Sequence, residues 1–331
     1  MITSPVFIIG CPRSGTTLLY RALSEARPLW SIGGESRHIV ERLHHPARSS
    51  WVSGALMADD LTPESKRFIR RAFEREAVPW TLWIRVNRLR GWLDRRSFWR
   101  TLKRTRGAQG RSSELAGTMP RVGMSAIRSA LRLRGRLRLG GDRPRRLLEK
   151  TPENCLRLPF LLEIFPDARI IHLTRDGRSN ISSLMEGWRR ADLFPGYRLP
   201  ERIAVPGVPA DRWAFTLIPD WRDLVASPLE EVCARQWMAC NEAVLAFCRN
   251  QGRGVPYLRV TYESLIDRFD EVLDEIAAFA DVELKPHPGG LSESNIVSPP
   301  AREKWRHLHG EEIRRIEPLI APTMERLGYV D

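Results

Sequence analysis

The sequence predicts an α/β fold in which a central, mostly parallel sheet is flanked by helices. Three short apolar runs rich in β-branched residues, 5–9, 169–174 and 256–260, have the length of buried strands. Amphipathic segments with helical spacing precede the second and third runs, at 158–165 and 232–247. Because strands that alternate with helices favour parallel pairing, we expect the ligand at the carboxyl ends of the strands.

Composition narrows the class of protein. The chain has 331 residues and 42% of them are hydrophobic, which allows a large core and argues against intrinsic disorder. No run approaches the ~18 apolar residues of a membrane span, and no secretory signal is visible. The five cysteines are an odd number without a CxxC pair. A disulfide framework or a zinc site is therefore disfavoured, and a reducing, cytoplasmic location is predicted.

The positive charge of the chain is concentrated in one segment. The formal net charge is +13, but residues 85–146 hold nineteen basic and three acidic side chains, so the rest of the chain carries −3. We interpret this segment as part of a basic, largely helical insertion, about residues 40–146, in a single domain of residues 1–331. Helical spacing predicts a helix at 82–102, whereas leucines that alternate with arginines at 131–139 fit a half-exposed strand or a helix.

The first predicted strand runs into a short loop that contains glycine. Residues 10–17, GCPRSGTT, nearly match the GxxxxGK[ST] loop that cradles nucleotide phosphates, and a helix-forming stretch, 18–23, follows. Thr16 replaces the lysine that reaches the β- and γ-phosphates in kinases, which disfavours phosphoryl transfer. Backbone N–H groups and the helix dipole can still hold an anion, and the guanidinium of Arg13 suits a phosphate or sulfate oxyanion.

A second anion site is predicted after the strand at 169–174. Arg175 follows that strand directly, and Ser183 stands eight residues later in a predicted helix, 179–188. Both side chains would then reach one further phosphate. Two strand ends, each with an arginine and hydroxyl groups, suit a ligand that carries two separated anionic groups.

These motifs resemble those of the sulfotransferases that use 3′-phosphoadenylyl sulfate (PAPS), and the tyrosylprotein branch most closely. The resemblance covers about residues 5–38 and 147–329 and implies a three-layer, P-loop-type fold. The matching motifs are Pro12 to Leu18 (PRSGTTL), Gly33 to Arg37 (GGESR), Glu149 to Pro152 (EKTP), Ile164 to Pro166 (IFP), Thr174 to Arg178 (TRDGR), Tyr262-Glu263 and Lys304-Trp305.

The resemblance also implies how the donor is held, with no metal. The residues implied to bind it are Arg13, Ser14, Gly15, Thr16 and Thr17 around the 5′-phosphosulfate, Arg175 and Ser183 at the 3′-phosphate, and Tyr262, Ser294, Ser298 and Lys304 as further contacts. The tyrosylprotein branch has one more arginine, at a position where this chain has Gly187. Arg189 or Arg190 would have to compensate for that difference.

Three residues are implied to act on the reacting groups. Glu35 occupies the position of the general base, which removes the proton of a hydroxyl acceptor. Lys150 and Arg13 would stabilise negative charge on the transferring sulfuryl group and on the departing phosphate. The neighbouring histidines and a cysteine fit structural roles better: His38, His44 and His45 at the surface, and His172 and Cys11 in the interior.

We therefore predict a PAPS-dependent sulfotransferase whose acceptor is a hydroxyl group of a small metabolite, lipid, saccharide or peptide tyrosine. Two other classes stay open: a non-catalytic basic adaptor that binds membrane or nucleic acid, and a P-loop kinase-like phosphotransferase. The insertion has aromatic residues among its arginines, at Trp83, Trp92, Phe98 and Trp99. These would let it lie on an anionic membrane surface, with the protein peripheral to it, or bind an acidic substrate. Nucleic acid is the less favoured partner.

Overall fold

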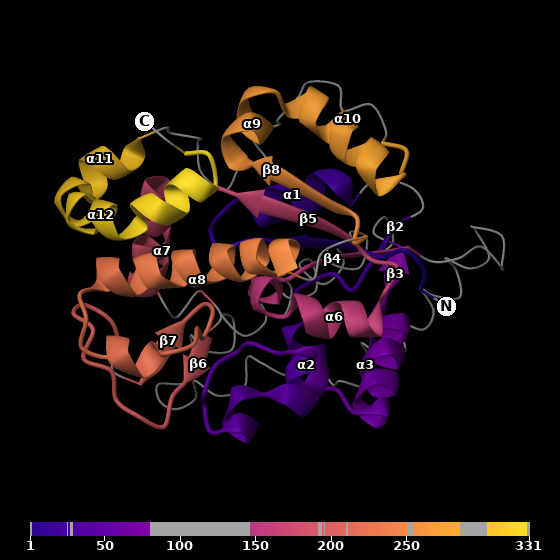
Figure 1. The fold of residues 1–331 in the computed structure, drawn as a ribbon, viewed down its shortest axis with the longest axis horizontal. Helices are drawn as coiled ribbons and strands as arrows, with labels where there is room; N and C mark the ends of the chain where they lie inside the picture. The colour runs from indigo at the N-terminus through magenta and orange to yellow at the C-terminus, as the bar shows by residue number, and fades with distance from the viewer. Residues whose placement is uncertain are drawn as a thin grey trace, which may run out of the picture.

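A six-stranded sheet in the order β3-β2-β4-β1-β5-β8 lies at the centre of the computed structural model (Figure 1). Its strands are β1 (Val6–Ile9), β2 (Leu29–Ser31), β3 (Val78–Pro79), β4 (Arg146–Lys150), β5 (Arg169–Thr174) and β8 (Tyr257–Thr261). All neighbours pair in parallel except β2 and β3, which are antiparallel. The residues described are 2–24, 26, 29–79, 146–190, 194, 196–209, 211–250, 254–284 and 303–329.

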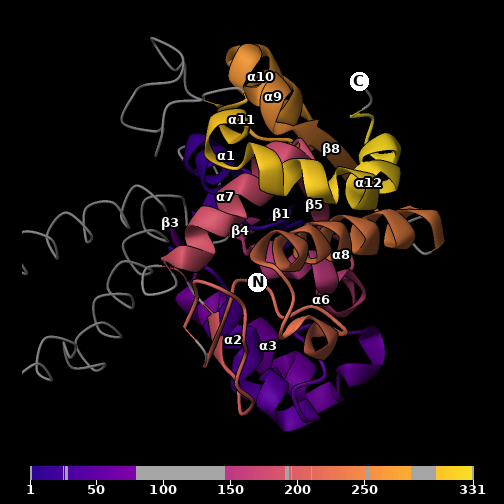
Figure 2. The same cartoon turned by 90° about the vertical axis from the view of Figure 1, so that its left-hand side faces the viewer.

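Helices cover both faces of the sheet, as the predicted α/β class requires (Figure 2). On one face, α1 (Thr16–Leu23) and α10 (Phe269–Ala280) share a core with Val6 and Ile8. On the other face, α6 (Leu158–Ile164), α7 (Gly177–Arg189), α8 (Leu229–Asn250) and α12 (Gly310–Arg326) share a core with Phe7 and Ile9. Because both faces are covered, every residue of β1 is buried, which explains its continuous apolar sequence.

The remaining elements complete the two layers and one side of the molecule. They are α2 (Arg37–His44), η1 (Pro46–Ser49), η2 (Ala58–Asp60), α3 (Pro63–Glu76), η3 (Pro152–Leu156), β6 (Gly196–Arg198), β7 (Arg212–Ala214), η4 (Trp221–Leu224), α9 (Tyr262–Asp267) and α11 (Lys304–Leu308). Strands β6 and β7 form a separate antiparallel pair. Among the described helices, none has the length and apolar composition that a membrane crossing needs.

The strands and helices predicted from apolar runs are confirmed at β1, β5, β8, α1, α6, α7 and α8. The sequence pattern missed β2 and β4. β4 has only two apolar residues, Leu147 and Leu148, and ends in two charged residues, yet all five of its residues are buried. It is a strand because β1 and β2 pair with it on either side, and its own sequence does not reveal that.

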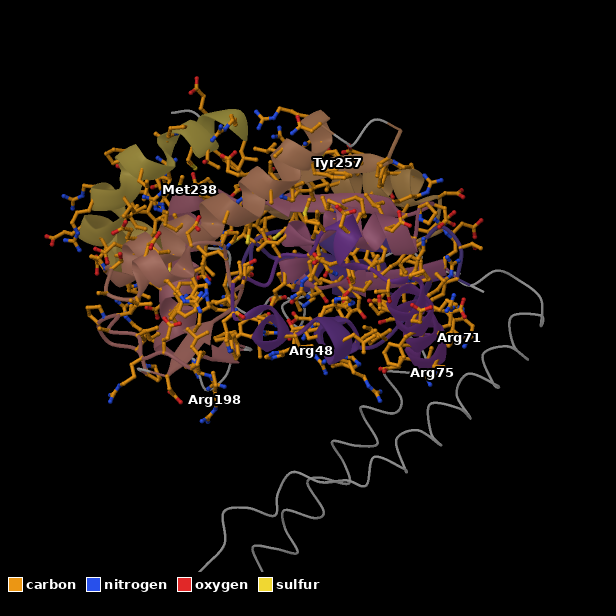
Figure 3. All side chains as sticks on the ribbon, turned by 60° about the horizontal axis from the view of Figure 1, so that its bottom comes forward. Arg48, Arg71, Arg75, Arg198, Met238 and Tyr257 are labelled. Carbon is orange, nitrogen blue, oxygen red and sulfur yellow. The ribbon has the colours of Figure 1, made fainter. Side chains whose placement is uncertain are left out.

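Of the segment that we interpreted as an insertion, about residues 40–146, residues 40–79 and Arg146 are described. In this part, Val40, Ile69 and Phe73 of α2 and α3 are buried in the same core as α6 and α8. Arginines such as Arg48 and Arg71 lie on the exposed surface of this region (Figure 3). The expected helix at 82–102 and the leucine–arginine alternation at 131–139 lie outside the described residues.

Candidate active site

The loop between β1 and α1 is shaped by two glycines. A Cβ at Gly10, whose φ is +154°, would lie 2.3 Å from the carbonyl oxygen of Leu173. A Cβ at Gly15, whose φ is +99°, would lie 2.4 Å from a ring carbon of Tyr262. Glycine is therefore required at both positions, because any side chain would push the loop away from β5 and α9. Arg13 also adopts a left-handed φ of 70°, which is uncommon for a residue with a side chain.

This loop and the end of β5 bring the predicted nucleotide contacts together. Arg13 Nε donates a hydrogen bond to Ser183 Oγ at 3.1 Å, and Arg175 Nη1 donates to the carbonyl oxygen of Arg13 at 3.1 Å. The guanidinium of Arg175 lies over the ring of Tyr262, 4.5 Å from its centroid. The guanidinium of Arg13 lies 4.8 Å from the ring centroid of Phe194. Four of the predicted donor residues thus form one cluster.

The charges of this cluster are not balanced by the described residues. Burial lowers the pKa of Arg13, and the positive charge of Arg175 lowers it further. Neither arginine forms an ion pair in the described part of the chain, and Arg175 Nε is buried without a hydrogen-bond partner there. A ligand with negative charge would offset the repulsion between the two guanidinium groups.

Polar groups of the loop also lack partners. Ser14 Oγ is fully buried and accepts or donates no hydrogen bond within the described residues. Thr16 is buried at the start of α1, where its backbone N–H belongs to the first helical turn, and Thr17 is exposed. Two arginines without an ion pair in the described part of the chain, the hydroxyl of Ser14 and a helix N-terminus are donors that suit a nucleotide with two phosphate positions. The residues present therefore fit the donor that the sequence implied.

Glu35 and Lys150 meet at the same edge of the sheet. Lys150 is the last residue of β4 and lies opposite Ile8 of β1 in the sheet register. Glu35 follows β2, which is the neighbour of β4 on the other side. Lys150 Nζ donates a hydrogen bond to Glu35 Oε1 at 2.6 Å, and 27% of the Glu35 side chain is exposed. The pair is therefore accessible to a substrate while it is anchored at the sheet.

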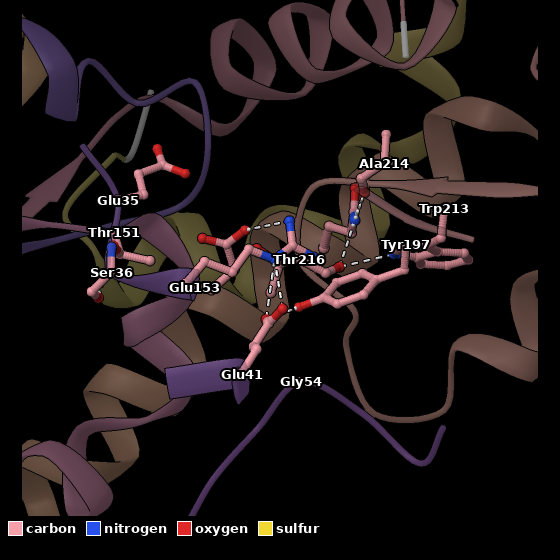
Figure 4. Close-up of polar contacts among 12 residues, drawn as sticks. Glu35, Ser36, Glu41, Gly54, Thr151, Glu153, Tyr197, Trp213, Ala214 and Thr216 are labelled. Atoms are coloured by element: carbon pink, nitrogen blue, oxygen red, sulfur yellow. Dashed lines mark hydrogen bonds and ion pairs between the residues drawn. The ribbon is translucent and has the colours of Figure 1, made fainter. Parts of the chain in front are cut away.

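A buried network of charges next to Glu35 escaped the sequence analysis (Figure 4). Arg157, which is fully buried, donates from Nη2 to Glu41 Oε1 at 2.9 Å, and Tyr197 donates to the same oxygen at 2.6 Å. Arg37 lies 3.1 Å from Glu41 and 3.6 Å from Glu153. Although burial opposes the charge of Glu41, the guanidinium groups of Arg37 and Arg157 lower its pKa. Only the i,i+4 spacing of Arg37 and Glu41 could have indicated this network from sequence.

Glu149, beside Lys150, is a second buried acid that sequence reasoning missed. Its side chain is fully buried on β4, and burial raises its pKa to about 7 against the opposing effect of hydrogen bonds from Thr151 and Ser36. Burial also raises the pKa of Glu153. The charge of Arg37 opposes this rise, and the charge of Glu35 adds to it. The base candidate Glu35 thus stands among acids whose charge is costly to bury.

Other predicted residues have plain structural positions. Lys304 is exposed at the start of α11, which packs on α7, and Ser294 and Ser298 lie outside the described residues. A Cβ at Gly187 would lie 2.3 Å from a ring carbon of Phe215, so no side chain fits where the tyrosylprotein branch has arginine. Arg189 hydrogen-bonds to Glu186 instead.

The histidines and the cysteine take up structural positions. His38 is exposed and hydrogen-bonds to Glu76, while the rings of His44 and His45 pack edge-on against Phe160 and Trp51. His172 is buried, its Nδ1 lies 2.9 Å from Tyr257 Oη, and burial lowers its pKa to about 3. Burial raises the pKa of Cys11 well above its ordinary value, which fits packing and not nucleophilic attack. The described residues contain no group of three or more His, Cys, Asp or Glu side chains placed to hold a metal ion.

A family model described as the sulfotransferase family matches residues 5–286, which include every strand of the sheet. The chain belongs to the sulfotransferase family. This confirms the resemblance found in the sequence motifs. As a member of that family, this sulfotransferase is an enzyme of sulfuryl transfer.

The chain is also similar to individual proteins and to solved structures. Protein-tyrosine sulfotransferase A of Caenorhabditis elegans is 24% identical over 347 residues, which cover 99% of this chain and 68% of that protein. The protein-tyrosine sulfotransferase of Drosophila melanogaster is 23% identical over 98% of this chain, and the chain spans about half of its length (51%). Among solved structures, sulfotransferase STF9 from Mycobacterium avium matches with a TM-score of 0.44 and 16% identity, over 98% of this chain and 77% of that one.

Proposed function

We propose that this sulfotransferase transfers the sulfuryl group of PAPS to a hydroxyl acceptor by direct in-line displacement, with Glu35 as the general base. One observation carries the proposal. Two arginines without a carboxylate partner in the described residues, at the ends of β1 and β5, share the carboxyl edge of the sheet with the Glu35–Lys150 pair. A doubly anionic donor complements the arginines, and an acceptor hydroxyl complements the carboxylate.

The donor would be held by the cluster around the first loop. Arg175 and Ser183 are proposed to bind the 3′-phosphate, and the residues of the cradle for the 5′-phosphosulfate are Ser14, Gly15, Thr16 and Thr17. Arg13 lies between these two groups, because its side chain reaches Ser183 while its backbone belongs to the cradle. Tyr262, packed between Gly15 and Arg175, is proposed as a further donor contact. Lys304, Ser294 and Ser298 stay predictions from the resemblance.

PAPS, when bound, supplies an activated sulfuryl group on a phosphate leaving group. Glu35 Oε atoms are proposed to take the proton of the acceptor hydroxyl as its oxygen becomes a nucleophile, which contributes about 10²–10⁴-fold to the rate. Lys150 contacts Glu35 and ends the strand next to β1. It can therefore turn from the carboxylate to the negative charge that develops at the donor, as can Arg13.

The acceptor is proposed to be a hydroxyl group, on the basis of the curated relatives. The two described above are named as protein-tyrosine sulfotransferases. A peptide tyrosine is therefore one candidate, beside the hydroxyl of a small metabolite, a lipid or a saccharide. We propose that residues 1–331 act as a single domain, and that the arginine-rich segment, about 85–146, contacts an acidic substrate or an anionic membrane surface.

Calorimetry with two nucleotides tests the proposal. The intact chain is titrated with 3′-phosphoadenosine 5′-phosphate (PAP), the product of the donor, and with ATP. We expect PAP to bind much more tightly than ATP, because Arg175 and Ser183 require a 3′-phosphate and Thr16 replaces the kinase lysine. Equal binding of ATP would favour the kinase-like alternative, and no binding of either nucleotide would favour the adaptor. Radiolabelled PAPS and candidate acceptors would then show where the label is transferred.

A further inference from the structure

The segments that follow β2 and β4 run side by side and touch residue by residue. Three pairs join them: Glu35 with Lys150, Ser36 with the Glu149–Thr151 stretch, and Arg37 with Glu153. The first pair is the candidate for chemistry. The contact of Ser36 with Glu149 and Thr151 has no part in the reaction proposed above, although Ser36 directly follows the proposed base Glu35.

The backbone of Ser36 is held by two buried side chains. Its N–H donates to Thr151 Oγ1 at 2.7 Å and to Glu149 Oε1 at 3.2 Å. Thr151 Oγ1 in turn donates a hydrogen bond to Glu149, and Asn154 Nδ2 donates to the other carboxylate oxygen of Glu149 at 3.0 Å. All four residues are fully buried. The amide that follows Glu35 is therefore fixed to β4 by a network that water does not reach.

The start of α2 uses its serine in an unusual way. Ser36 is the N-cap residue of α2, a position where a serine hydroxyl normally accepts a hydrogen bond from the first turn of the helix. Here the side chain makes no capping hydrogen bond, and its hydroxyl lies 3.1 Å from Thr151 Oγ1 instead. Helix α2 therefore lacks the usual N-cap hydrogen bond, and the Ser36 hydroxyl instead makes a second hydrogen bond to Thr151, beside the one from its backbone N–H.

On the other side of Glu35 the backbone consists of two glycines. Gly33 and Gly34 precede it, Gly33 has a φ of +77°, and a Cβ at Gly34 would meet no atom within 4 Å. Further back, Ser31 Oγ accepts a hydrogen bond from Gly33 N at 2.8 Å and contacts the hydroxyl of Tyr20. Glu35 thus follows two residues with the widest backbone freedom, while the residue after it is held at Ser36.

We propose that Glu149 and Thr151 are positioning residues, which hold the Ser36 amide and thereby direct the Glu35 carboxylate toward Lys150 and the acceptor. The inference rests on the proposed function, because it assigns a purpose to the orientation of Glu35. A small displacement of a general base lowers the rate strongly, so such an anchor has a measurable effect on turnover. Binding of the donor, which depends on the ends of β1 and β5, is unaffected.

The anchor depends on the protonation of Glu149. The groups around that carboxyl are the charged Lys150 on its own strand, Tyr20 on α1, and the neutral Ser36, Thr151 and Asn154. As a carboxylate, Glu149 accepts hydrogen bonds at both oxygens, as the geometry requires. Once protonated it has an O–H that needs an acceptor, so either Asn154 reverses its amide to offer Oδ1, or Thr151 Oγ1 accepts and no longer donates to Glu149. The anchor is therefore tightest above pH about 7.

Hydrogen–deuterium exchange of the intact protein tests the anchor without any need for turnover. Thr151→Val removes the hydroxyl but keeps the shape of the side chain, and Thr151→Ser keeps the hydroxyl. We expect the Ser36 amide to exchange about 10-fold faster in Thr151→Val, and as in the wild type in Thr151→Ser, after correction for intrinsic rates. Unchanged exchange in Thr151→Val would overturn the inference. If Thr151→Val does not fold, exchange of the Ser36 amide is measured in Glu149→Gln instead, where faster exchange supports the inference and unchanged exchange overturns it.

A second measurement separates this inference from the proposed function. PAP affinity is measured by calorimetry, and transfer from labelled PAPS is measured with p-nitrophenol as the acceptor probe. We expect Thr151→Val to bind PAP as the wild type does and to turn over about 10²-fold more slowly, with an unchanged KM for PAPS. We expect the wild-type rate to rise with pH through about 7, and Glu149→Gln to lose that limb. Equal turnover of both threonine variants would refute the positioning role.

The two proposals fail in different ways. If the wild type does not bind PAP, the proposed function is wrong, while the exchange of the Ser36 amide still decides whether Glu149 and Thr151 fix the loop. If the wild type binds PAP and transfers sulfate but Thr151→Val matches it in exchange and in rate, only the positioning role is wrong.

Discussion

The two halves of the sheet's carboxyl edge balance their charges in opposite ways. At the ends of β1 and β5, Arg13 and Arg175 have no carboxylate partner within the described residues. At the ends of β2 and β4, each acid has a cation or a hydrogen-bond donor, as with Glu35 and Lys150, or Glu149 and Thr151. By the ion pairs of the described residues, we call the first half incomplete and the second half complete, although Arg37, Glu153 and Arg157 also keep buried polar atoms without a hydrogen-bond partner there. Under the proposed function, this difference assigns the anionic donor to the first half and proton transfer to the second.

The largest expected effect comes from the base itself. Glu35→Gln should lower the turnover of sulfuryl transfer by about 10²–10⁴-fold, because the amide cannot take a proton. PAP affinity should stay the same, because the donor residues lie on the other half of the edge. Initial rates with labelled PAPS and calorimetry with PAP check the two statements. Glu163→Gln, at an exposed ion pair with Lys66, is the control and should have wild-type activity. A rate for Glu35→Gln within a few-fold of that control would contradict the base assignment.

The second effect is on the stability of the protein and comes from a buried ion pair in the complete half. Arg157→Met removes the buried cation that contacts Glu41 and leaves that carboxylate with fewer partners in the interior. We expect the free energy of unfolding to fall by about 3–5 kcal/mol. Lys66→Met, at the exposed ion pair with Glu163, should cost less than about 1 kcal/mol. Urea unfolding of both variants measures the difference, and similar costs would show that the buried network is not a structural unit.

The contrast between the halves also explains what the sequence could predict. Continuous apolar runs such as Val6–Ile9 revealed β1 and β5, because both faces of these strands are buried. The run at β8 was also recognised, although this edge strand is only partly buried and Arg259 is exposed on it. The loop residues from Gly10 to Thr17 and Arg175 were found because their motif is local. The complete half was harder, because its partners are far apart: Tyr197 contacts Glu41 across 156 positions and Ser36 contacts Glu149 across 113. Glu149 and Arg157 are charged residues of types that are usually exposed, and only the packing around them places them in the interior.

The third effect is on the affinity for PAP and concerns the incomplete half, which contains Arg13 and Arg175. Arg175→Met should weaken PAP binding by about 10–10²-fold, because a charge-assisted contact to phosphate is lost. Its effect on the stability of the unliganded protein should be small, because the change also removes the repulsion that lowers the pKa of Arg13. Calorimetry and urea unfolding give the two values. Arg67→Met on α3, where Arg67 pairs with Glu64 at the surface, is the matched control and should leave PAP binding unchanged. A large loss of stability with unchanged affinity would place Arg175 in the structural half.

The smallest effect, taken per pH unit, is the pH dependence that Glu149 gives to folding. Its pKa is about 7 in the folded protein, against an ordinary value of 4.5, because burial disfavours the carboxylate. The folded state therefore binds the proton more tightly than the unfolded state. Its stabilising contribution is fully present below pH about 4.5 and is lost as the pH rises through about 7.

Glu149→Gln has no such proton, so its stability relative to the wild type should improve between these pH values, by at most about 1.4 kcal/mol per pH unit. Urea midpoints of both proteins across this range measure the change, and Glu163→Gln should show none of it. A constant difference between wild type and Glu149→Gln would mean that Glu149 does not titrate in this window. The expected result has a functional meaning, because the carboxylate that holds Ser36 best is the form that burial penalises. The protein would then give up stability above neutral pH in exchange for a fixed orientation of Glu35.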